Sequence, residues 1–408
     1  MNGLSLFYSF FTIKFPNFTL ENHPAKIYNL IQVRACPGLK YEETDTRVSE
    51  RRKIMDKIKM AVVGYGGMGG WHVRQVLDMD KFELKGIWDI DPERREIAKE
   101  NGLGVYSSFE AVLEDKEVEL VLIATWNDVH KPLAIAAMRA GKNVISEKPV
   151  TLSSEDLNEM IAVAEETGKL FTVHQNRRWD SDFLTMKNIY DKNTLGRIFR
   201  IESRVQGSRG IPGDWRKEKQ HGGGMVYDWG VHLLDQALTF CDSDPLVSVY
   251  AQLTNITNVE CDDGFYAELR FKSGLSYLVE VTTNNFISLP RWYILGENGS
   301  SSFDWDLNGQ TVLVRDWEKI DAVPVKVGTG ITKTMAPRTD ETISEIPIEE
   351  MHGEWVEYYD NIYDVIRNGA EQTVCHRQMR RCLALIEAIF ESGAKNEVVK
   401  FNDLYYNK

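Results

Sequence analysis

The feature that most constrains the fold is a glycine-rich segment that follows a β-branched run. Residues Ile58–Val63 have the pattern of a buried strand, and the segment from Gly64 to Gly69 reads GYGGMG. A helical pattern to about Leu77 and a second strand ending at Asp89 come next. A GxGxxG motif alone is weak evidence. In a strand–turn–helix–strand setting with a following acidic residue, it predicts a dinucleotide-binding Rossmann domain.

This fingerprint assigns a role to each of its residues. Unpaired N–H groups and the dipole at a helix N-terminus favour anions, so a pyrophosphate is expected there. The backbone that would contact it belongs to Gly64, Gly66, Gly67, Met68 and Gly69. Asp89 would accept hydrogen bonds from both ribose hydroxyls of NAD and would repel the additional phosphate of NADP. Arg94 and Arg95 follow closely enough to weaken that preference, so NAD is expected and NADP is the alternative.

Strand and helix patterns keep alternating after Asp89. We expect strands over residues 119–125 and 143–146 with a helix between them. This alternation implies an α/β fold with a parallel, doubly wound sheet, whose ligand lies beyond the carboxyl ends of the strands. Two polar groups fall at those ends: TWNDVH at residues 125–130 and EKP at residues 147–149.

Beyond Leu195 the pattern changes to longer strands with alternating or β-branched residues. These candidate strands occupy residues 198–206, 246–254, 264–271, 275–283 and 292–295. An open, mostly antiparallel sheet with one inserted helix, at residues 221–235, is the simplest account of this half. Two amphipathic helices, at about 352–367 and 376–391, end the chain. We expect both of them to pack on the first domain.

The pattern divides the chain into four parts. They are an extension (1–54), a dinucleotide-binding Rossmann domain (55–176), a substrate and oligomerisation domain (177–350) and C-terminal helices (351–408). The extension has aromatic bulk without helix or strand periodicity, and we expect it to lie outside the fold. It also lacks the basic start and uninterrupted apolar run of a secretory signal. Arg51 and Arg52 are what a purine-rich ribosome-binding site would encode, so a start at Met55 is one hypothesis and a partner-binding arm is the other.

The composition excludes several classes of partner. A net charge of -13 argues against nucleic acid, whose binding needs clustered lysine and arginine. No run of about 18 uncharged apolar residues is present, so we expect no membrane span. The five cysteines are scattered without a CxxC pair, which fits neither a disulfide framework nor a zinc site. We therefore expect a cytoplasmic protein with a small-molecule substrate.

The segment HGGGMVYDWGVHLLD, from His221 to Asp235, carries the catalytic candidates. Asp228, His232 and Asp235 recur at steps of four and three, which places them on one face of a helix. A carboxylate one turn from an imidazole orients it and keeps it basic enough to accept a proton near neutral pH. By itself the pattern also fits a structural histidine. We expect the preceding glycines to mark where a side chain would collide with cofactor or substrate.

Four motifs together resemble the glucose–fructose oxidoreductase and inositol dehydrogenase family (Gfo/Idh/MocA). They are ATxNxxH before a strand, EKP after it, GGG followed by DxGxHxxD, and the C-terminal helix pair. The likeness extends from about Lys57 to the end of the chain. It implies an N-terminal Rossmann domain, a C-terminal sheet that often forms the interface of a homo-oligomer, and NAD(P)-dependent oxidation of sugar or cyclitol hydroxyls.

The resemblance also carries residue roles. Lys148 matches the family's EKP lysine, which contacts both the cofactor and the reacting hydroxyl. Asp228 and His232 match its carboxylate and its catalytic histidine. Besides the fingerprint residues, further cofactor positions match Thr125, Asn127, His130 and Glu147. The chain departs from the family pattern at Trp126, where proline is usual, and at Ser146, where cysteine is common.

These residue types suit hydride transfer from a secondary alcohol. A base must take the hydroxyl proton as the hydride leaves carbon, so we assign His232 as the base and Asp228 as its orienting partner. Lys148 would stabilise the developing alkoxide, and because it supplies the positive charge no metal is needed. Indole faces and guanidinium groups suit a carbohydrate ring, although each such residue also fits a purely structural role. The substrate candidates are Trp126, Arg178, Trp179, Arg209 and Trp215.

We therefore predict an NAD-dependent dehydrogenase that oxidises a ring secondary hydroxyl of a sugar, a cyclitol or a glycoside, for example position 3 of a glucoside. One alternative is a glycoside hydrolase or lyase that oxidises its substrate transiently with bound NAD and releases the aglycone without net NADH. The other is a non-catalytic NAD-binding scaffold. The presence of Lys148, Asp228 and His232 together favours an enzyme.

Overall fold

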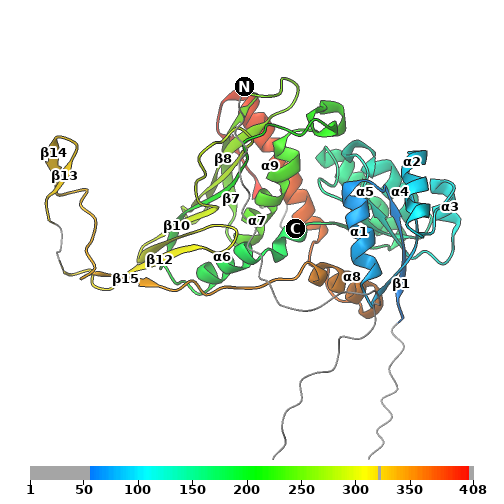
Figure 1. Cartoon of the computed structure of the whole chain (residues 1–408), viewed down its shortest axis with the longest axis horizontal. Helices are drawn as coiled ribbons and strands as arrows, with labels where there is room; N and C mark the ends of the chain where they lie inside the picture. The colour runs from blue at the N-terminus through cyan, green and yellow to red at the C-terminus, as the bar shows by residue number, and fades with distance from the viewer. Residues whose placement is uncertain (1–55, 320–322, 404–408) are drawn as a thin grey trace, which may run out of the picture. The chain divides into compact units, whose positions relative to one another are not determined.

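The computed structural model describes residues 56–319 and 323–403, so the extension predicted at residues 1–54 lies outside the described part. The described residues belong to one compact unit that contains two large sheets (Figure 1). Within that part of the chain, no helix has both the length and the apolar character needed to cross a membrane.

The first domain is a five-stranded, fully parallel sheet with the order β2-β1-β3-β4-β5. Its strands are β1 (Ile58–Val63), β2 (Phe82–Trp88), β3 (Leu120–Ile123), β4 (Asn143–Ser146) and β5 (Phe171–Val173). Its helices are α1 (Gly67–Leu77), α2 (Pro92–Glu100), α3 (Phe109–Glu114), α4 (His130–Arg139) and α5 (Ser154–Thr167). Of the central strands, β3 is buried along its whole length and β1 at every residue except Lys59, because helices cover both faces of the sheet, which explains their apolar sequences. The predicted doubly wound fold is confirmed.

The second domain is a nine-stranded sheet with the order β15-β12-β11-β10-β6-β9-β8-β7-β16. All neighbours pair antiparallel except β6 and β9, so the predicted mostly antiparallel sheet is confirmed. Its strands are β6 (Ile198–Gln206), β7 (Leu246–Thr254), β8 (Gly264–Phe271), β9 (Ser276–Thr282), β10 (Trp292–Gly296), β11 (Gly299–Phe303), β12 (Gly309–Val314), β15 (Ile343–Ile346) and β16 (Val399–Lys400). A separate hairpin is formed by β13 (Val325–Val327) and β14 (Gly330–Thr332).

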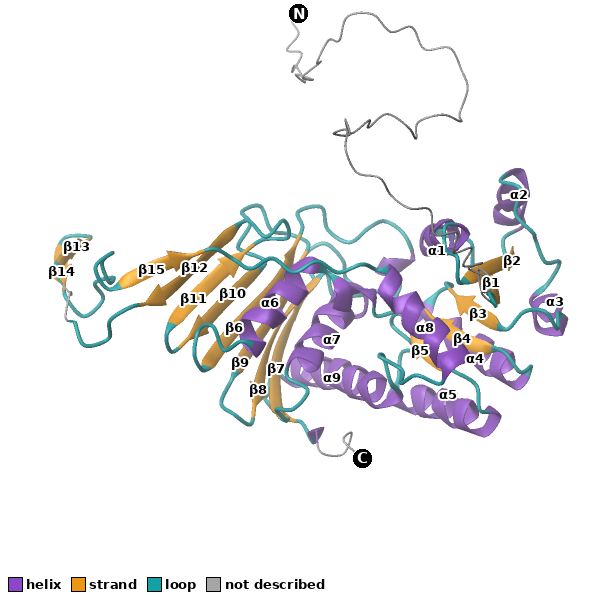
Figure 2. Ribbon diagram, turned by 90° about the horizontal axis from the view of Figure 1, so that it is seen from below, coloured by secondary structure: helices purple, strands orange, loops and turns teal. Residues whose placement is uncertain are grey.

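Three helices cover one face of the second sheet (Figure 2). They are α6 (Ser181–Asp191), α7 (Val231–Phe240) and α9 (His376–Lys395). Alternate residues of the strands, such as Tyr277 and Val279 of β9, are buried beneath these helices. The core of this domain therefore lies between the sheet and the three helices.

The two C-terminal helices pack on different parts of the molecule. Helix α8 (Val356–Asn368) lies on the first domain, where Arg367 binds the Glu119 carboxylate at 2.8 Å. Helix α9 runs along α7 and β7, and the Ser392 hydroxyl accepts the N–H of Ala251 at 2.9 Å. It meets the first domain through Glu387, which accepts the N–H of Ser154. Both helices therefore contact the first domain, and α9 in addition packs its apolar face against α7 of the second domain.

Candidate active site

A lysine of the first domain and an aspartate of the second meet between the two sheets. Lys148 follows β4, and Asp228 lies in a π-helical turn, η5 (Val226–Gly230), that precedes α7. The Lys148 ammonium donates to the Asp228 carboxylate at 3.1 Å and to its backbone carbonyl at 3.0 Å. Burial alone would raise the pKa of the Asp228 carboxyl, but Lys148 and Arg216 outweigh it and hold that pKa below its usual value. The Asp228 carboxyl is therefore ionised at neutral pH.

His232 lies in the first turn of α7 and is buried. Its Nδ1 atom has no hydrogen-bond partner among the described residues. Burial, followed by the positive charges of Lys148 and Arg177, holds the pKa of His232 well below its usual value of 6.5. The imidazole is therefore neutral at pH 7, which is the state in which it can accept a proton.

The predicted pairing of Asp228 with His232 requires correction. No hydrogen bond joins these two side chains in the part of the chain that the structure describes, and Asp228 instead binds Lys148. The spacing of four residues predicted one continuous α-helix, whereas the segment begins with the π-helical turn η5 and becomes α-helical only at Val231. A π-turn changes the angular register of side chains, so sequence spacing alone does not fix their contacts.

The glycine-rich segment separates into two pairs of glycines with different constraints. A Cβ on Gly64 would lie 2.4 Å from the Ala124 carbonyl oxygen, and one on Gly69 would lie 1.8 Å from the Gly64 carbonyl oxygen. These two glycines allow β1, the following loop and α1 to pack closely. A Cβ on Gly67 would meet nothing within 4 Å, and one on Gly66 would meet only Arg94, at 4.0 Å. The space around Gly66 and Gly67 at the start of α1 is thus open, beside Met68, which is 40% exposed, and a helix N-terminus favours an anion there.

Asp89 lies at the end of β2 beside this loop. Its two carboxylate oxygens accept the backbone N–H groups of Tyr65, at 2.6 Å, and Asp91, at 2.8 Å. Each carboxylate oxygen has a second lone pair, so the group can still accept ribose hydroxyls. Arg94 donates to the Tyr65 carbonyl at 3.3 Å, on the same side of the loop. The geometry accordingly provides an acceptor for ribose hydroxyls and a nearby cation that favours an additional phosphate.

The TWNDVH segment after β3 contacts the second domain. The Asn127 amide donates to the Gly222 carbonyl at 3.1 Å, and the half-exposed Trp126 ring lies 4.2 Å from that of His221. Asp128 lies 3.0 Å from Nδ1 of the same histidine. Asn127 and Trp126, predicted to contact cofactor and substrate respectively, therefore also connect the two domains.

Two of the predicted cofactor residues, His130 and Thr125, form hydrogen bonds with protein groups. The His130 ring nitrogens face the carbonyls of Pro149, at 3.0 Å, and of Thr125, at 3.3 Å. Within the described part of the chain, the half-buried Thr125 side chain donates only to the neighbouring carbonyl of Trp126. His130 consequently holds together the loops that follow β3 and β4.

Glu147 is also buried, at the centre of a polar cluster. Its carboxylate lies 2.7 Å from Nε2 of His72 and 2.9 Å from Nδ1 of His174, and it accepts the N–H of Lys148 at 3.0 Å. Although burial raises the pKa of Glu147, His174 and His72 hold it well below its usual value. Burial lowers the pKa of His72 to about 4. An ionised carboxylate that is hydrogen-bonded to the imidazoles of His72 and His174 thus fixes the backbone that carries Lys148.

The three glycines after His221 are required for packing within the protein. A Cβ on Gly222, whose φ is +70°, would lie 2.3 Å from the Leu152 side chain. One on Gly223 would lie 2.2 Å from the Arg216 carbonyl, and one on Gly224 would lie 2.2 Å from the Asp262 carboxylate. We expected a side chain at these positions to collide with cofactor or substrate. The structure shows that it would instead collide with neighbouring loops.

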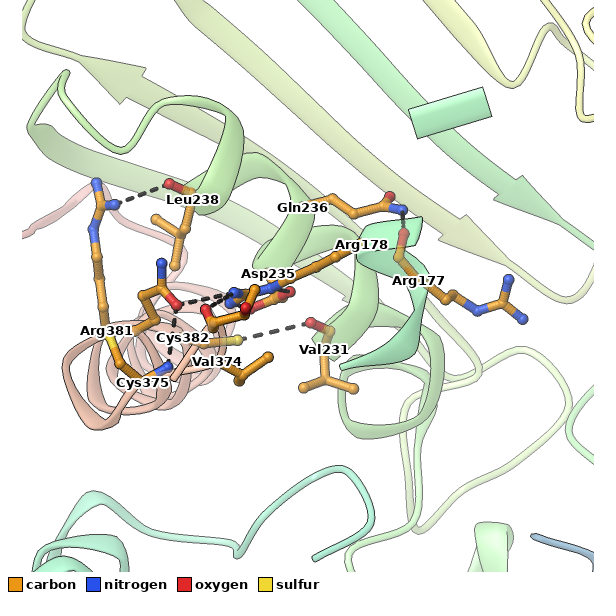
Figure 3. Close-up of polar contacts among 12 residues, drawn as sticks. Arg177, Arg178, Val231, Asp235, Gln236, Leu238, Val374, Cys375, Arg381 and Cys382 are labelled. Atoms are coloured by element: carbon orange, nitrogen blue, oxygen red, sulfur yellow. Dashed lines mark hydrogen bonds and ion pairs between the residues drawn. The ribbon is translucent and has the colours of Figure 1, made fainter. Parts of the chain in front are cut away.

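The predicted substrate residues occupy different environments. Arg178 is buried, and its guanidinium binds the Asp235 carboxylate at 2.6 and 2.7 Å (Figure 3). It therefore joins the segment after β5 to α7, and its assignment to the substrate is corrected. Trp179 packs against Tyr358 of α8, with ring centroids 5.8 Å apart. Arg209 is exposed on the loop after β6, and Trp215 is half-buried beneath the guanidinium of Arg216.

Several residues near His232 were not predicted from the sequence. Arg177 lies over the Trp229 ring at 4.3 Å, and Trp305, from the turn between β11 and β12, lies 6.1 Å from the same ring. The choice between Arg177 and Arg178 depends on the direction of each side chain in a 3₁₀ turn. Trp305 is far from the motifs in sequence, and only the pairing of β10, β11 and β12 brings it to the site.

Comparisons with known proteins agree with this architecture. The model described as "Oxidoreductase family, NAD-binding Rossmann fold" matches residues 58–175, and the model of the GFO/IDH/MocA C-terminal domain matches residues 183–302. The crystal structure of a NAD-binding protein from Listeria innocua is 47% identical, with a TM-score of 0.82, over 85% of this chain and 99% of that one.

Two curated relatives have named activities. The scyllo-inositol 2-dehydrogenase (NADP(+)) of Bacillus subtilis is 28% identical over 87% of this chain and 98% of its own length. The 1,5-anhydro-D-fructose reductase of Ensifer adhaerens is 31% identical over 44% of this chain and 55% of its own length.

Substitution by alanine can distinguish the glycines of the GYGGMG loop that face open space from those that pack against backbone. In Gly66→Ala the new Cβ meets no protein atom closer than 4.0 Å, so we expect unchanged thermal unfolding but a loss of NAD affinity of at least about tenfold, because the pyrophosphate would approach that atom. In Gly69→Ala the collision at 1.8 Å should lower the free energy of unfolding by about 3 kcal/mol. Titration calorimetry with NAD, together with urea unfolding, measures both effects. An unchanged dissociation constant in Gly66→Ala would contradict the assignment.

Proposed function

Because the chain belongs to the Gfo/Idh/MocA family of NAD(P)-dependent oxidoreductases, we propose that it oxidises a ring secondary hydroxyl of a sugar, glycoside or cyclitol with NAD. The observation that carries the proposal is the meeting of Lys148, Asp228 and His232 between the dinucleotide-binding domain and the second domain. The names of two relatives, an inositol dehydrogenase and an anhydrofructose reductase, support a polyhydroxylated ring as the substrate.

Lys148 is the proposed electrophilic group. It has a mostly buried ammonium, with 15% of its side chain exposed, and its cost of burial is offset by Asp228. A substrate oxygen that binds the same ammonium would be stabilised as negative charge develops on it. Asp228 keeps the ammonium pointed into the space between the domains and, with its second oxygen 3.4 Å from Arg216, is itself held in place. This role replaces the predicted contact of Asp228 with His232.

His232 is the proposed base. It is neutral because burial and two neighbouring cations disfavour the imidazolium. As the substrate hydroxyl loses its proton to the imidazole, the resulting imidazolium lies near the carboxylates of the site, of which Glu147 raises the pKa of His232. The same groups serve the reverse reaction, in which His232 donates a proton to a carbonyl oxygen. The residues thus support proton transfer at the hydroxyl in either direction.

The first domain has groups that suit the pyrophosphate and the ribose of NAD. The open space at Gly66 and Gly67, at the N-terminus of α1, suits a pyrophosphate, and the Asp89 carboxylate suits ribose hydroxyls. When bound, NAD accepts the hydride that leaves the carbinol carbon. We assign NAD as the preferred cofactor because Asp89 would repel the additional phosphate of NADP, while Arg94 reduces that penalty.

The proposal is tested by a panel of inositols, free hexoses and glycosides with NAD and NADP, followed by NADH absorbance. We expect at least one ring polyol to give NADH, and His232→Ala to reduce kcat/KM by about a thousandfold because the base is lost. The half-buried His376, which faces the Phe171 carbonyl, provides a control as His376→Ala. No NADH with any polyol, or equal activity in His232→Ala, would overturn the proposal. Release of an aglycone without net NADH would instead indicate a transiently oxidising hydrolase.

The pH dependence of kcat/KM tests the state of His232. The base acts in its unprotonated form, and its pKa is held well below 6.5, so the rate should stay level as pH falls through 6.5 and decline only below it. Arg177→Met removes one of the charges that lower this pKa, so the acid limb should move to higher pH. The matched variant Arg197→Met, at an arginine that is 66% exposed and paired with Glu297, should not move it. An acid limb centred above pH 7 in the parent would contradict the assignment.

A further inference from the structure

A row of aromatic rings leads away from His232 along the second domain. Trp229 belongs to η5, and its ring centroid lies 6.2 Å from that of His232. Trp305 lies in the turn between β11 and β12, and its ring centroid is 6.1 Å from that of Trp229, at an interplanar angle of 63°. The two indoles therefore extend the wall of the proposed site beyond the reacting hydroxyl.

Each of these indoles rests on a guanidinium. Arg177 lies 4.3 Å from the Trp229 ring and 5.9 Å from the Trp305 ring. Arg291 lies 4.6 Å from the Trp305 ring. Cation–π contacts of this kind stabilise a ring in one position. The aromatic wall is thus preorganised before any ligand binds.

Arg291, which contacts the Trp305 ring, is held rigidly. Arg291 is 2% exposed, and its guanidinium donates to the Gln236 side chain at 2.9 Å and lies 3.2 Å from the Asp182 carboxylate. Its backbone N–H donates to Asp304, the residue next to Trp305, at 3.1 Å. The turn that carries Trp305 is therefore fixed to the core of the second domain.

Despite these contacts, 44% of Trp305 is exposed to solvent. Leaving a large apolar ring in water is unfavourable, by about 25 cal/mol for each Å² of apolar surface. An indole that is held by buried contacts yet keeps an open face is suited to stacking against the flat apolar face of another ring. The turn could have been closed by a small polar residue if its only role were to connect β11 and β12.

From this geometry we infer that Trp229 and Trp305 form an outer subsite for a second ring, linked to the ring whose hydroxyl is oxidised. The inference rests on the proposed function, because Lys148 and His232 place the reacting ring beside Trp229. The substrate class is then a glycoside rather than a free monosaccharide or cyclitol. The second ring is a sugar or an aromatic aglycone, since both offer a flat apolar face to an indole.

The test uses the sugar that the substrate panel identifies as the best one, in four forms. They are the free sugar, its methyl glycoside, its phenyl glycoside and a disaccharide in which it is the non-reducing residue. Values of kcat and KM are measured with NAD for the parent, Trp305→Ala and Trp305→Phe. We expect the parent to prefer the two-ring compounds. Trp305→Ala should lose about tenfold in kcat/KM, mainly through KM, with those compounds alone, and Trp305→Phe should recover most of the loss.

Trp317→Ala provides the matched control, because Trp317 is also an exposed tryptophan, at 58%, but lies beyond β12 beneath Arg338. It should leave all four kinetic profiles unchanged. A larger loss with the phenyl glycoside than with the disaccharide would identify an aromatic aglycone, and the reverse would identify a second sugar. Equal loss with one-ring and two-ring compounds, or a parent that prefers the free sugar or an inositol, would overturn the subsite while leaving the proposed function intact. Absence of NADH with every compound would overturn both.

Discussion

The ion pair between Lys148 and Asp228 is the interaction on which the arrangement of the two domains at the site depends. It joins the carboxyl end of β4 to the π-helical turn before α7, with each side chain about 85% shielded from solvent, as their exposures of 15% and 16% indicate. A charge placed there without its partner would be strongly destabilising. The sheet of the first domain and the inserted helix of the second are therefore joined at the place that we propose for the nicotinamide and the substrate hydroxyl.

The groups beneath Lys148 show how the fold maintains this position. Glu147 receives hydrogen bonds from His72 of α1, from His174 after β5 and from the peptide N–H of Lys148. The Tyr359 hydroxyl of α8 lies 2.5 Å from the remaining nitrogen of His72. The return of a C-terminal helix to the first domain thus completes a buried polar cluster whose members are almost all paired, as burial of such groups requires. His174 is the exception, because its Nε2 has no partner among the described residues.

Local patterns predicted the strands and the dinucleotide loop well. The predicted bounds are confirmed for β1, β6, β7 and β8. Burial of one or both faces of a sheet requires apolar residues at regular positions, so the sequence pattern shows where such strands begin and end. The positions of Lys148 and Asp89 at strand ends followed from the same reasoning. Contacts between distant segments were not available in this way. Arg178 could not be distinguished from Arg177, and Trp305 could not be connected to Trp229, until the 3₁₀ turn and the sheet order were known.

The coupling between Lys148 and Asp228 can be measured with a double-mutant cycle on kcat/KM. The cycle compares Lys148→Met, Asp228→Asn and the double variant with the best substrate. If Asp228 acts by holding Lys148, its removal should matter only while the lysine is present. We expect the double variant to lose no more than Lys148→Met alone, a loss on the order of a hundredfold. Losses that multiply in the double variant would show that the two residues act independently, which would contradict the role assigned to the pair.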